Sequence, residues 1–245
     1  MAHERDDIRE ESGDASTPPS SYRMVAERAD FLLIDKAPDI SVHRDQEQYG
    51  LVERVAAEHG CAQLYLVHRL DRMTSGLLLL AKSAASCAAL ARQFAEHKIE
   101  KMYVALSDRK PLKKQGSVRG DMLRARDGAW RLARSLENPA LTVFHSRSVE
   151  PGLRLFVLRP RTGKTHQLRV AMKSLGAPIL GDSRYGGSVA ERGYLHACAL
   201  RFEYAGETVC FSEPPRTGAL FCDPMVQVAL QEELDDWRRE MDCAR

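Results

Sequence analysis

Residues 68–82 read His-Arg-Leu-Asp-Arg-Met-Thr-Ser-Gly-Leu-Leu-Leu-Leu-Ala-Lys and hold one aspartate, Asp71, between two apolar runs. We predict a short strand over residues 64–70 and a buried strand over residues 76–81, so that Asp71 lies in the loop between them. A carboxylate held between two strands is mounted rigidly, as a nucleophile or a general base must be. Asp71 is therefore the first candidate catalytic residue.

The same stretch allows two other interpretations. A protein kinase catalytic loop has His-Arg-Asp with an asparagine five residues after the aspartate. Here Leu70 separates the arginine from Asp71, and Gly76 stands where the asparagine should be, so the kinase interpretation fails. The remaining alternative is an aspartate whose hydrogen bonds only hold its own loop in place.

A second polar motif occupies residues 161–170, which read Arg-Thr-Gly-Lys-Thr-His-Gln-Leu-Arg-Val. A phosphate-binding loop would need a glycine where Leu158 stands, so the Gly-Lys-Thr triplet does not indicate a nucleotide site. We predict that a strand over residues 153–159 precedes this motif and ends at Pro160.

The motif continues into a helix, which we expect to run from an N-cap at Thr165 to Leu175. Helical spacing places Arg169 on a polar stripe with Thr165 and Lys173, apart from the apolar residues that face the core. An arginine on such a stripe is more often solvated than functional.

A third motif, residues 101–105, reads Lys-Met-Tyr-Val-Ala and lies in a predicted strand over residues 99–106. Alternation along the strand puts Lys101, Tyr103 and Ala105 on one face and the apolar residues between them on the other. One face of this strand can therefore belong to the core while the other lines a cleft. A buried tyrosine whose hydroxyl is simply satisfied is the alternative.

Together these motifs resemble those of the RluA-type pseudouridine synthases, in the same order and over most of residues 25–225. The resemblance implies that Asp71 performs the chemistry and that Arg169 pairs with it and keeps it ionised. It also implies that Tyr103 stacks on the target base, and that Leu195, in Leu-His-Ala, belongs to the apolar pocket.

The function implied is the isomerisation of specific uridines to pseudouridine in a structured RNA, either ribosomal or transfer RNA. The base is flipped out, detached at C1′, rotated and rejoined at C5, which requires no metal and no other cofactor. Asp71 could attack C1′, remove a sugar proton or attack the pyrimidine ring, and the sequence leaves these routes open. A catalytically silent RNA-binding protein is the main rival, whereas the His-x-Glu and Pro-Cys-x-x-Cys of a zinc deaminase are absent.

RNA binding is expected to involve arginines and lysines outside the catalytic motifs. Arg69 is placed to reach into the stack that the flipped base vacates. We interpret residues 109–134 as a mobile basic segment that closes on RNA phosphates, the alternative being a solvated loop. The residues of this segment that we expect to bind substrate are Lys113, Lys114, Arg119 and Arg124.

The elements around these motifs predict an α+β fold, with a mixed, largely antiparallel sheet flanked by helices and a central catalytic cleft, as the resemblance also implies. Ser83 is a plausible helix N-cap, and Asp223 with Pro224 opens a terminal helix. Residues 195–202 and 208–211 are expected to form a hairpin.

The 245-residue chain divides by composition into two parts. Residues 1–22 carry a net charge of −4 and few large apolar groups, so we predict a disordered acidic tail. Residues 23–245 form the predicted catalytic domain, and the tail leaves no room for the S4-type RNA-binding domain of many relatives. Without a long apolar run or a signal peptide, we expect a soluble, cytoplasmic monomer with no membrane partner. The six cysteines include no Cys-x-x-Cys pair, and we expect them to be reduced and mostly buried.

Overall fold

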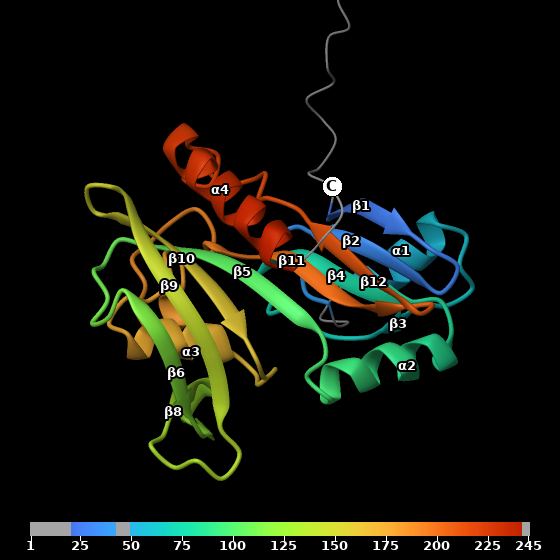
Figure 1. Ribbon diagram of the computed structural model, residues 1–245, viewed down its shortest axis with the longest axis horizontal. Helices are drawn as coiled ribbons and strands as arrows, with labels where there is room; N and C mark the ends of the chain where they lie inside the picture. Colours follow the sequence, from blue (N-terminus) through green and yellow to red (C-terminus); the bar gives the residue numbers. More distant parts are fainter. Residues whose placement is uncertain (1–20, 43–49, 242–245) are drawn as a thin grey trace, which may run out of the picture.

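The computed structural model describes residues 21–42 and 50–241, and in these ranges most strands join one large sheet (Figure 1). The strands are β1 (Tyr22–Glu27), β2 (Phe31–Lys36), β3 (Tyr65–Leu66), β4 (Ser75–Ala81), β5 (Glu100–Ser107), β6 (Gln115–Gly120), β7 (Met122–Arg124), β8 (Trp130–Leu132), β9 (Ala140–Glu150), β10 (Leu153–Pro160), β11 (Leu195–Tyr204) and β12 (Glu207–Ser212). The helices are α1 (Leu51–Glu58), α2 (Ala84–Ala95), α3 (Gln167–Ser174) and α4 (Pro224–Glu240), with short 3₁₀ turns η1 (Arg126–Gly128) and η2 (Ser183–Tyr185).

The strands of the large sheet lie in the order β1-β2-β4-β11-β5-β10-β9-β6, with β3 on β4 and β12 on β11. The β4 and β11 pair is parallel, and the other pairs of described strands are antiparallel. Gly76 makes the parallel contact possible, because a Cβ there would lie 2.3 Å from the carbonyl oxygen of Ala197. Its φ of +111° also favours glycine. The predicted mixed, largely antiparallel α+β fold is confirmed.

The central strands are buried on both faces because helices cover the sheet on two sides. In Figure 1, α4 crosses one side of the sheet and α3 lies on the other. Helices α1 and α2 cover opposite faces of β4, because Val55 of α1 packs with Leu78 and Leu90 of α2 packs with Leu77. The side chains of Leu230 and Trp237 on α4 join the same core as Met102 on β5 and Phe156 on β10. The face of β5 that does not meet α4 is left to line a cavity.

Local signals predicted several element ends. Ser83 caps α2 by accepting a hydrogen bond from the Ser86 amide, and Asp223 caps α4. Two ends differ from the prediction. The expected strand over residues 64–70 is reduced to β3, and α3 begins after His166, which adopts a left-handed conformation with φ 55°, rather than after Thr165.

The basic segment of residues 109–134 is the largest difference from the sequence prediction, because it contains strands and is not a loop. Strand β6 pairs with β9 at the edge of the large sheet, and β7 and β8 form a separate hairpin. An edge strand can remain polar on much of its surface, since fewer of its side chains face the core. The side chains of β6 are mostly exposed, so its sequence lacks the alternation of apolar and polar residues that predicts a strand.

Most of the predicted acidic tail, residues 1–20, lies outside the described residues. Strand β1 starts at Tyr22, one residue before the predicted boundary, and the Tyr22 side chain is buried. In the part of the chain that the structure describes, no helix is long and apolar enough to cross a membrane.

The cysteines depart from the expectation that they are reduced and mostly buried. Cys210 is disulfide-bonded. Among the free thiols Cys61, Cys87, Cys198 and Cys222, only that of Cys198 is buried.

Candidate active site

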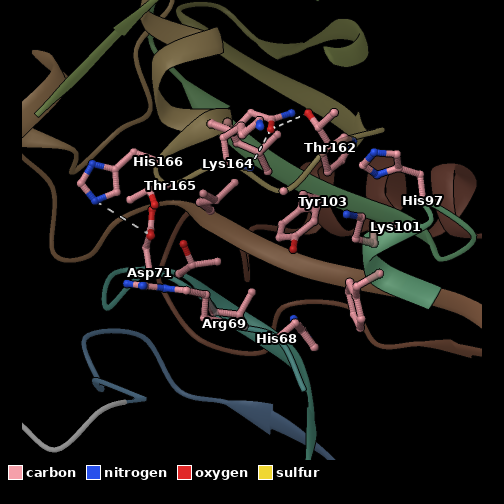
Figure 2. Close-up of a pocket in the computed structure, with 18 of the residues that line it drawn as sticks. His68, Arg69, Asp71, His97, Lys101, Tyr103, Thr162, Lys164, Thr165 and His166 are labelled. Atoms are coloured by element: carbon pink, nitrogen blue, oxygen red, sulfur yellow. Dashed lines mark hydrogen bonds and ion pairs between the residues drawn. The ribbon is translucent and has the colours of Figure 1, made fainter. Parts of the chain in front are cut away.

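A cavity of about 450 Å³ opens beside the face of β5 that carries Lys101 and Tyr103 (Figure 2). Its walls come from the loop after β3, the end of α2, strand β5 and the loop that leads into α3. Three of these four segments, all but the end of α2, carry the motifs that the sequence singled out. Figure 2 shows Asp71 and His166 on one side of Tyr103, and Lys101 and His97 on the other.

Two hydrogen bonds to backbone carbonyls hold the loop that carries Asp71. Its carbonyl accepts a hydrogen bond from the Thr74 amide at 3.0 Å. The next carbonyl, that of Arg72, accepts one at 3.1 Å from Lys36. Lys36 is fully buried at the end of β2 and also binds the carbonyls of Ala37 and Ile40. The loop is therefore fastened to the sheet, and the carboxylate can enter the cavity in a fixed direction.

Arg169 lies behind Asp71, with Nη1 3.5 Å from the carboxylate. Its Nε and Nη2 bind both oxygens of Asp182 at 2.7 and 2.8 Å, and its guanidinium stacks 4.8 Å from the centre of the Tyr185 ring. The Arg169 side chain is buried, so the polar stripe predicted for this helix does not leave it in solvent. The two hydrogen bonds to Asp182 fix the orientation of the guanidinium, so that its third nitrogen, Nη1, points toward Asp71.

His166 approaches Asp71 from another direction, with Nε2 4.0 Å from the carboxylate. The Tyr185 hydroxyl accepts a hydrogen bond from the Trp130 amide at 3.0 Å and lies 2.8 Å from His166 Nδ1. The hydroxyl proton is thus free to be donated to Nδ1, which leaves the ring hydrogen on Nε2, toward Asp71. Burial lowers the pKa of His166, which favours this neutral form.

Tyr103 and Leu195 form the floor of the cavity. They lie on neighbouring strands, where Leu195 pairs with Ala105 and Tyr103 pairs with Ala197. Burial, and next the charge of Asp71, raise the pKa of Tyr103, so its phenol stays protonated at neutral pH. The floor of the cavity therefore consists of a flat aromatic ring and an apolar side chain, both in the cavity that Asp71 also lines.

The structure brings Asp71, Arg169, Tyr103 and Leu195 together and places the exposed Arg69 at the cavity wall. It does not bring the basic residues Lys113, Lys114, Arg119 and Arg124 there, since they lie on or beside β6 and β7.

Sequence reasoning gave no role to three residues that support Asp71, namely His166, Asp182 and Tyr185. All three lie in or just after the second motif, so the signal was present in the motif, but only the fold shows their contacts.

The sequence of residues 30–174 matches the model of the family described as RNA pseudouridylate synthase. The chain belongs to this family. It is therefore an isomerase that acts on uridine in RNA, and the resemblance to RluA-type synthases is confirmed.

Related proteins agree with this assignment. The synthase is 52% identical over 210 residues to an uncharacterized RNA pseudouridine synthase of Haemophilus influenzae, covering 85% of this chain and 94% of that protein. It is 40% identical over 129 residues to ribosomal large subunit pseudouridine synthase C of Rickettsia conorii, covering 51% of this chain and 43% of that one. The chain thus matches less than half of the Rickettsia protein's length.

Solved structures show the same fold. Human RNA Pseudouridylate Synthase Domain Containing 1 is 26% identical to this synthase, with a TM-score of 0.68 over 81% of this chain and 86% of that one. The predicted pseudouridine synthase fold is confirmed.

Proposed function

We propose that Asp71 is the carboxylate that carries out uridine isomerisation in this synthase. The observation that carries the proposal is its position, on a fastened loop, facing the cavity, with Arg169 3.5 Å behind it. The buried guanidinium gives the carboxylate of Asp71 a fixed ionic partner, and Asp182 holds that guanidinium still. Preorganisation of this kind is what a nucleophile or base needs.

The rest of the cavity is assigned to the flipped nucleotide. Tyr103 stacks on the uracil ring, and Leu195 covers the apolar edge of the same site. Arg169 and His166 act through Asp71 and are positioning residues. This division keeps Asp71 and its two partners at one side of the ring and the flat, apolar groups beneath it.

We propose that the substrate is a stem-loop of ribosomal RNA, because a relative from Rickettsia conorii is named for the ribosomal large subunit. A transfer RNA stem-loop is the alternative, and a monomeric, cytoplasmic enzyme acting without metal or cofactor is part of the same proposal. A loop is favoured since flipping a base costs least where it is not paired. Mapping pseudouridine in cells that lack the protein distinguishes the two RNAs.

RNA outside the cavity is assigned to two regions. Arg69, which is exposed at the cavity wall, fills the space left by the flipped base. The exposed cations at β6 and β7 contact phosphates further along the RNA, so they supply affinity and no chemistry. The cations are Lys113, Lys114, Arg119 and Arg124.

The first test replaces Asp71 with asparagine. Asp71→Asn keeps the shape of the side chain but removes its charge, so we expect turnover to be abolished while RNA affinity changes little. Tritium release from RNA transcripts labelled at uridine C5 measures turnover, and filter binding measures affinity. Turnover comparable to that of the wild type would show that another group performs the reaction.

A further inference from the structure

Lys101 lies on β5 and lines the cavity on the same strand face as Tyr103. Only 9% of Lys101 is exposed, although lysine is among the residues most rarely buried without a partner. In Figure 2 its amino group points into the cavity beside Tyr103, on the side away from Asp71. The reaction chemistry assigned above does not use this group.

The Lys101 ammonium has no acceptor among residues 21–42 and 50–241. Its contact there is with the Phe94 ring, whose centre lies 5.6 Å from Nζ. A cation over an aromatic ring recovers part of the missing hydration, about 0.5–2 kcal/mol, but it leaves the N–H donors without a lone pair. Burial accordingly lowers the pKa of Lys101 to about 8. An ammonium held in this way is prepared for an acceptor that arrives with the substrate.

The position of Lys101 relative to Asp71 defines which part of the nucleotide it meets. Residues two apart on a strand are separated by about 7 Å, so Lys101 lies beside a base stacked on Tyr103. On each chemical route Asp71 acts at the sugar or at the adjoining edge of the pyrimidine ring. The sugar and its phosphates therefore lie at the Asp71 end, and the opposite edge of the base, with N3 and O4, lies toward Lys101.

We propose that Lys101 donates a hydrogen bond to O4 of the target uracil and so selects uracil against cytosine. Uracil offers an acceptor at this position, whereas cytosine offers an amino group, which is a donor. A lysine has only donors, so cytosine would leave the buried ammonium and its own amino group facing each other unpaired. This inference rests on the proposed function, because the position of the base is deduced from the roles of Asp71 and Tyr103 proposed above.

The same hydrogen bond assists the reaction itself. When the bond between C1′ and N1 breaks, its electron pair stays on uracil, whose negative charge is shared with O4. Attack on the ring also places charge on O4. On the first two routes C1′ is meanwhile bonded to the Asp71 carboxylate, or joined by a double bond after a sugar proton has passed to Asp71. When uracil forms the bond from C5 to C1′, the bond to Asp71 breaks or the sugar proton returns, and the proton that leaves C5 is taken up by N1. A cation at O4 stabilises the charged ring as the bond to N1 breaks. The rotation that brings C5 to C1′ also brings O2 to the place that O4 held, so the ammonium then meets O2.

The test compares binding of RNAs that differ at one base. The probes are synthetic stem-loops around the mapped target, with uridine, cytidine or 2-pyrimidinone riboside at that position. The last lacks O4, and its N3 is an acceptor where uridine has N3–H, so the comparison with Lys101→Met identifies the part of the difference that is due to O4. Binding is measured in the Asp71→Asn background, so that no RNA is converted. We expect uridine RNA to bind about ten- to a hundredfold more tightly than the RNA without O4, and Lys101→Met to reduce this ratio to nearly one.

Two further variants serve as controls. Lys98→Met removes a nearby exposed lysine, which is paired with Glu96 and does not line the cavity, and should keep the wild-type ratio. Lys101→Arg keeps a cation and should keep most of the ratio. An unchanged ratio in Lys101→Met overturns the inference. If Lys101→Met weakens the binding of all three RNAs equally, the inference is also overturned, because Lys101 would then contact a phosphate and not the base.

Stability and turnover complete the test. Lys101→Met replaces a buried cation without an acceptor by an apolar chain, so its melting temperature should equal or exceed that of the wild type, while its kcat falls. A folding role for Lys101 would instead lower the melting temperature. If the wild-type enzyme releases no tritium from any RNA, the proposed function itself fails, which is distinct from a failure of the Lys101 ratio.

Discussion

At the scale of single residues, one guanidinium serves two carboxylates in this synthase. Asp182 takes Nε and Nη2 of Arg169 at 2.7 and 2.8 Å, and Nη1 remains for Asp71 at 3.5 Å. The closer, bidentate contact with Asp182 fixes the plane of the guanidinium, and the longer contact with Asp71 places positive charge beside the carboxylate in the cavity. Because Arg169 has a rigid fork of donors, it can do both at once, which an ammonium cannot.

We therefore predict that Arg169→Lys lowers kcat by about a hundredfold, the size expected when a reacting group is misplaced by an ångström, while KM changes little. Tritium release at saturating RNA measures the effect. Tyr185→Phe is the comparison variant: it keeps the ring against the guanidinium and removes the hydroxyl that contacts His166 and the Trp130 amide, so its kcat should fall less. A lysine variant with the wild-type kcat would show that the pairing does not orient Asp71.

The sequence could single out Asp71 and Tyr103, because their motif and strand alternation are local properties. It could not show that Arg169 is buried. Helical spacing assigned it to a polar stripe, and its burial depends on Asp182 and Tyr185, which reach it from the following loop. A contact between residues that only the tertiary fold brings together leaves no periodic pattern in the sequence.

At the scale of elements, the difference between the predicted basic loop and the observed strands changes how the cations are presented. Lys113 and Lys114 precede β6, Arg119 lies on it, and Arg124 ends β7 with its guanidinium 5.6 Å from the Trp130 ring centre. Strand pairing with β9 fixes β6 against the sheet. The cations are thus displayed on an ordered edge, outside the cavity.

We predict that replacing Lys113, Lys114, Arg119 and Arg124 by alanine weakens RNA binding and flattens its salt dependence by about 0.7–0.9 of a log-log unit for each phosphate that is no longer neutralised. Turnover at saturating RNA should fall less, because Asp71 and its partners are untouched, so the defect should appear as a raised KM. Binding titrations from low to moderate salt provide the measurement. An unchanged slope would mean that the phosphates lie elsewhere, near Arg69 and Lys173.

Element ends show the same limit of local signals. Ser83 and Asp223 were recognised as N-caps because a small polar side chain before an apolar run is sufficient to mark them. His166 could not be recognised, since its left-handed conformation, with φ 55°, places the ring between Tyr185 and Asp71. A non-glycine residue in that region is uncommon and is typical of functional sites.

At the scale of the whole molecule, the centre of the sheet depends on a contact between distant segments. Strands β4 and β11 pair in parallel, with His196 opposite Ser75. His196 Nε2 donates to the Glu213 carbonyl at 3.1 Å, so in the neutral ring Nδ1 accepts from the Ser75 hydroxyl at 2.8 Å, and this hydroxyl in turn accepts from Arg192 at 2.6 Å. No sequence pattern predicts this order of strands, and burial favours the neutral form of the histidine in this contact.

This neutral histidine gives the molecule a defined response to acid. Burial, with nearby Arg192, Arg23 and Lys36, lowers the pKa of His196 to about 3. In the unfolded chain its pKa is about 6.5, so from pH about 6.5 down to 3 the unfolded state binds a proton that the folded state refuses. The free energy of unfolding must therefore fall as the pH is lowered through this window.

We predict that His196→Gln, which keeps a donor for the Glu213 carbonyl, makes the free energy of unfolding less dependent on pH between 6.5 and 4.5, by up to about 1.4 kcal/mol per pH unit. The variant will be less stable at pH 7, because the Ser75 contact is imperfect, so the slope rather than the absolute value is the measurement. Urea unfolding at a series of pH values provides it. His97→Gln, at an exposed position, is the control and should retain the wild-type slope. Equal slopes in the wild type and His196→Gln would mean that folding does not lower the pKa of His196, contrary to its burial.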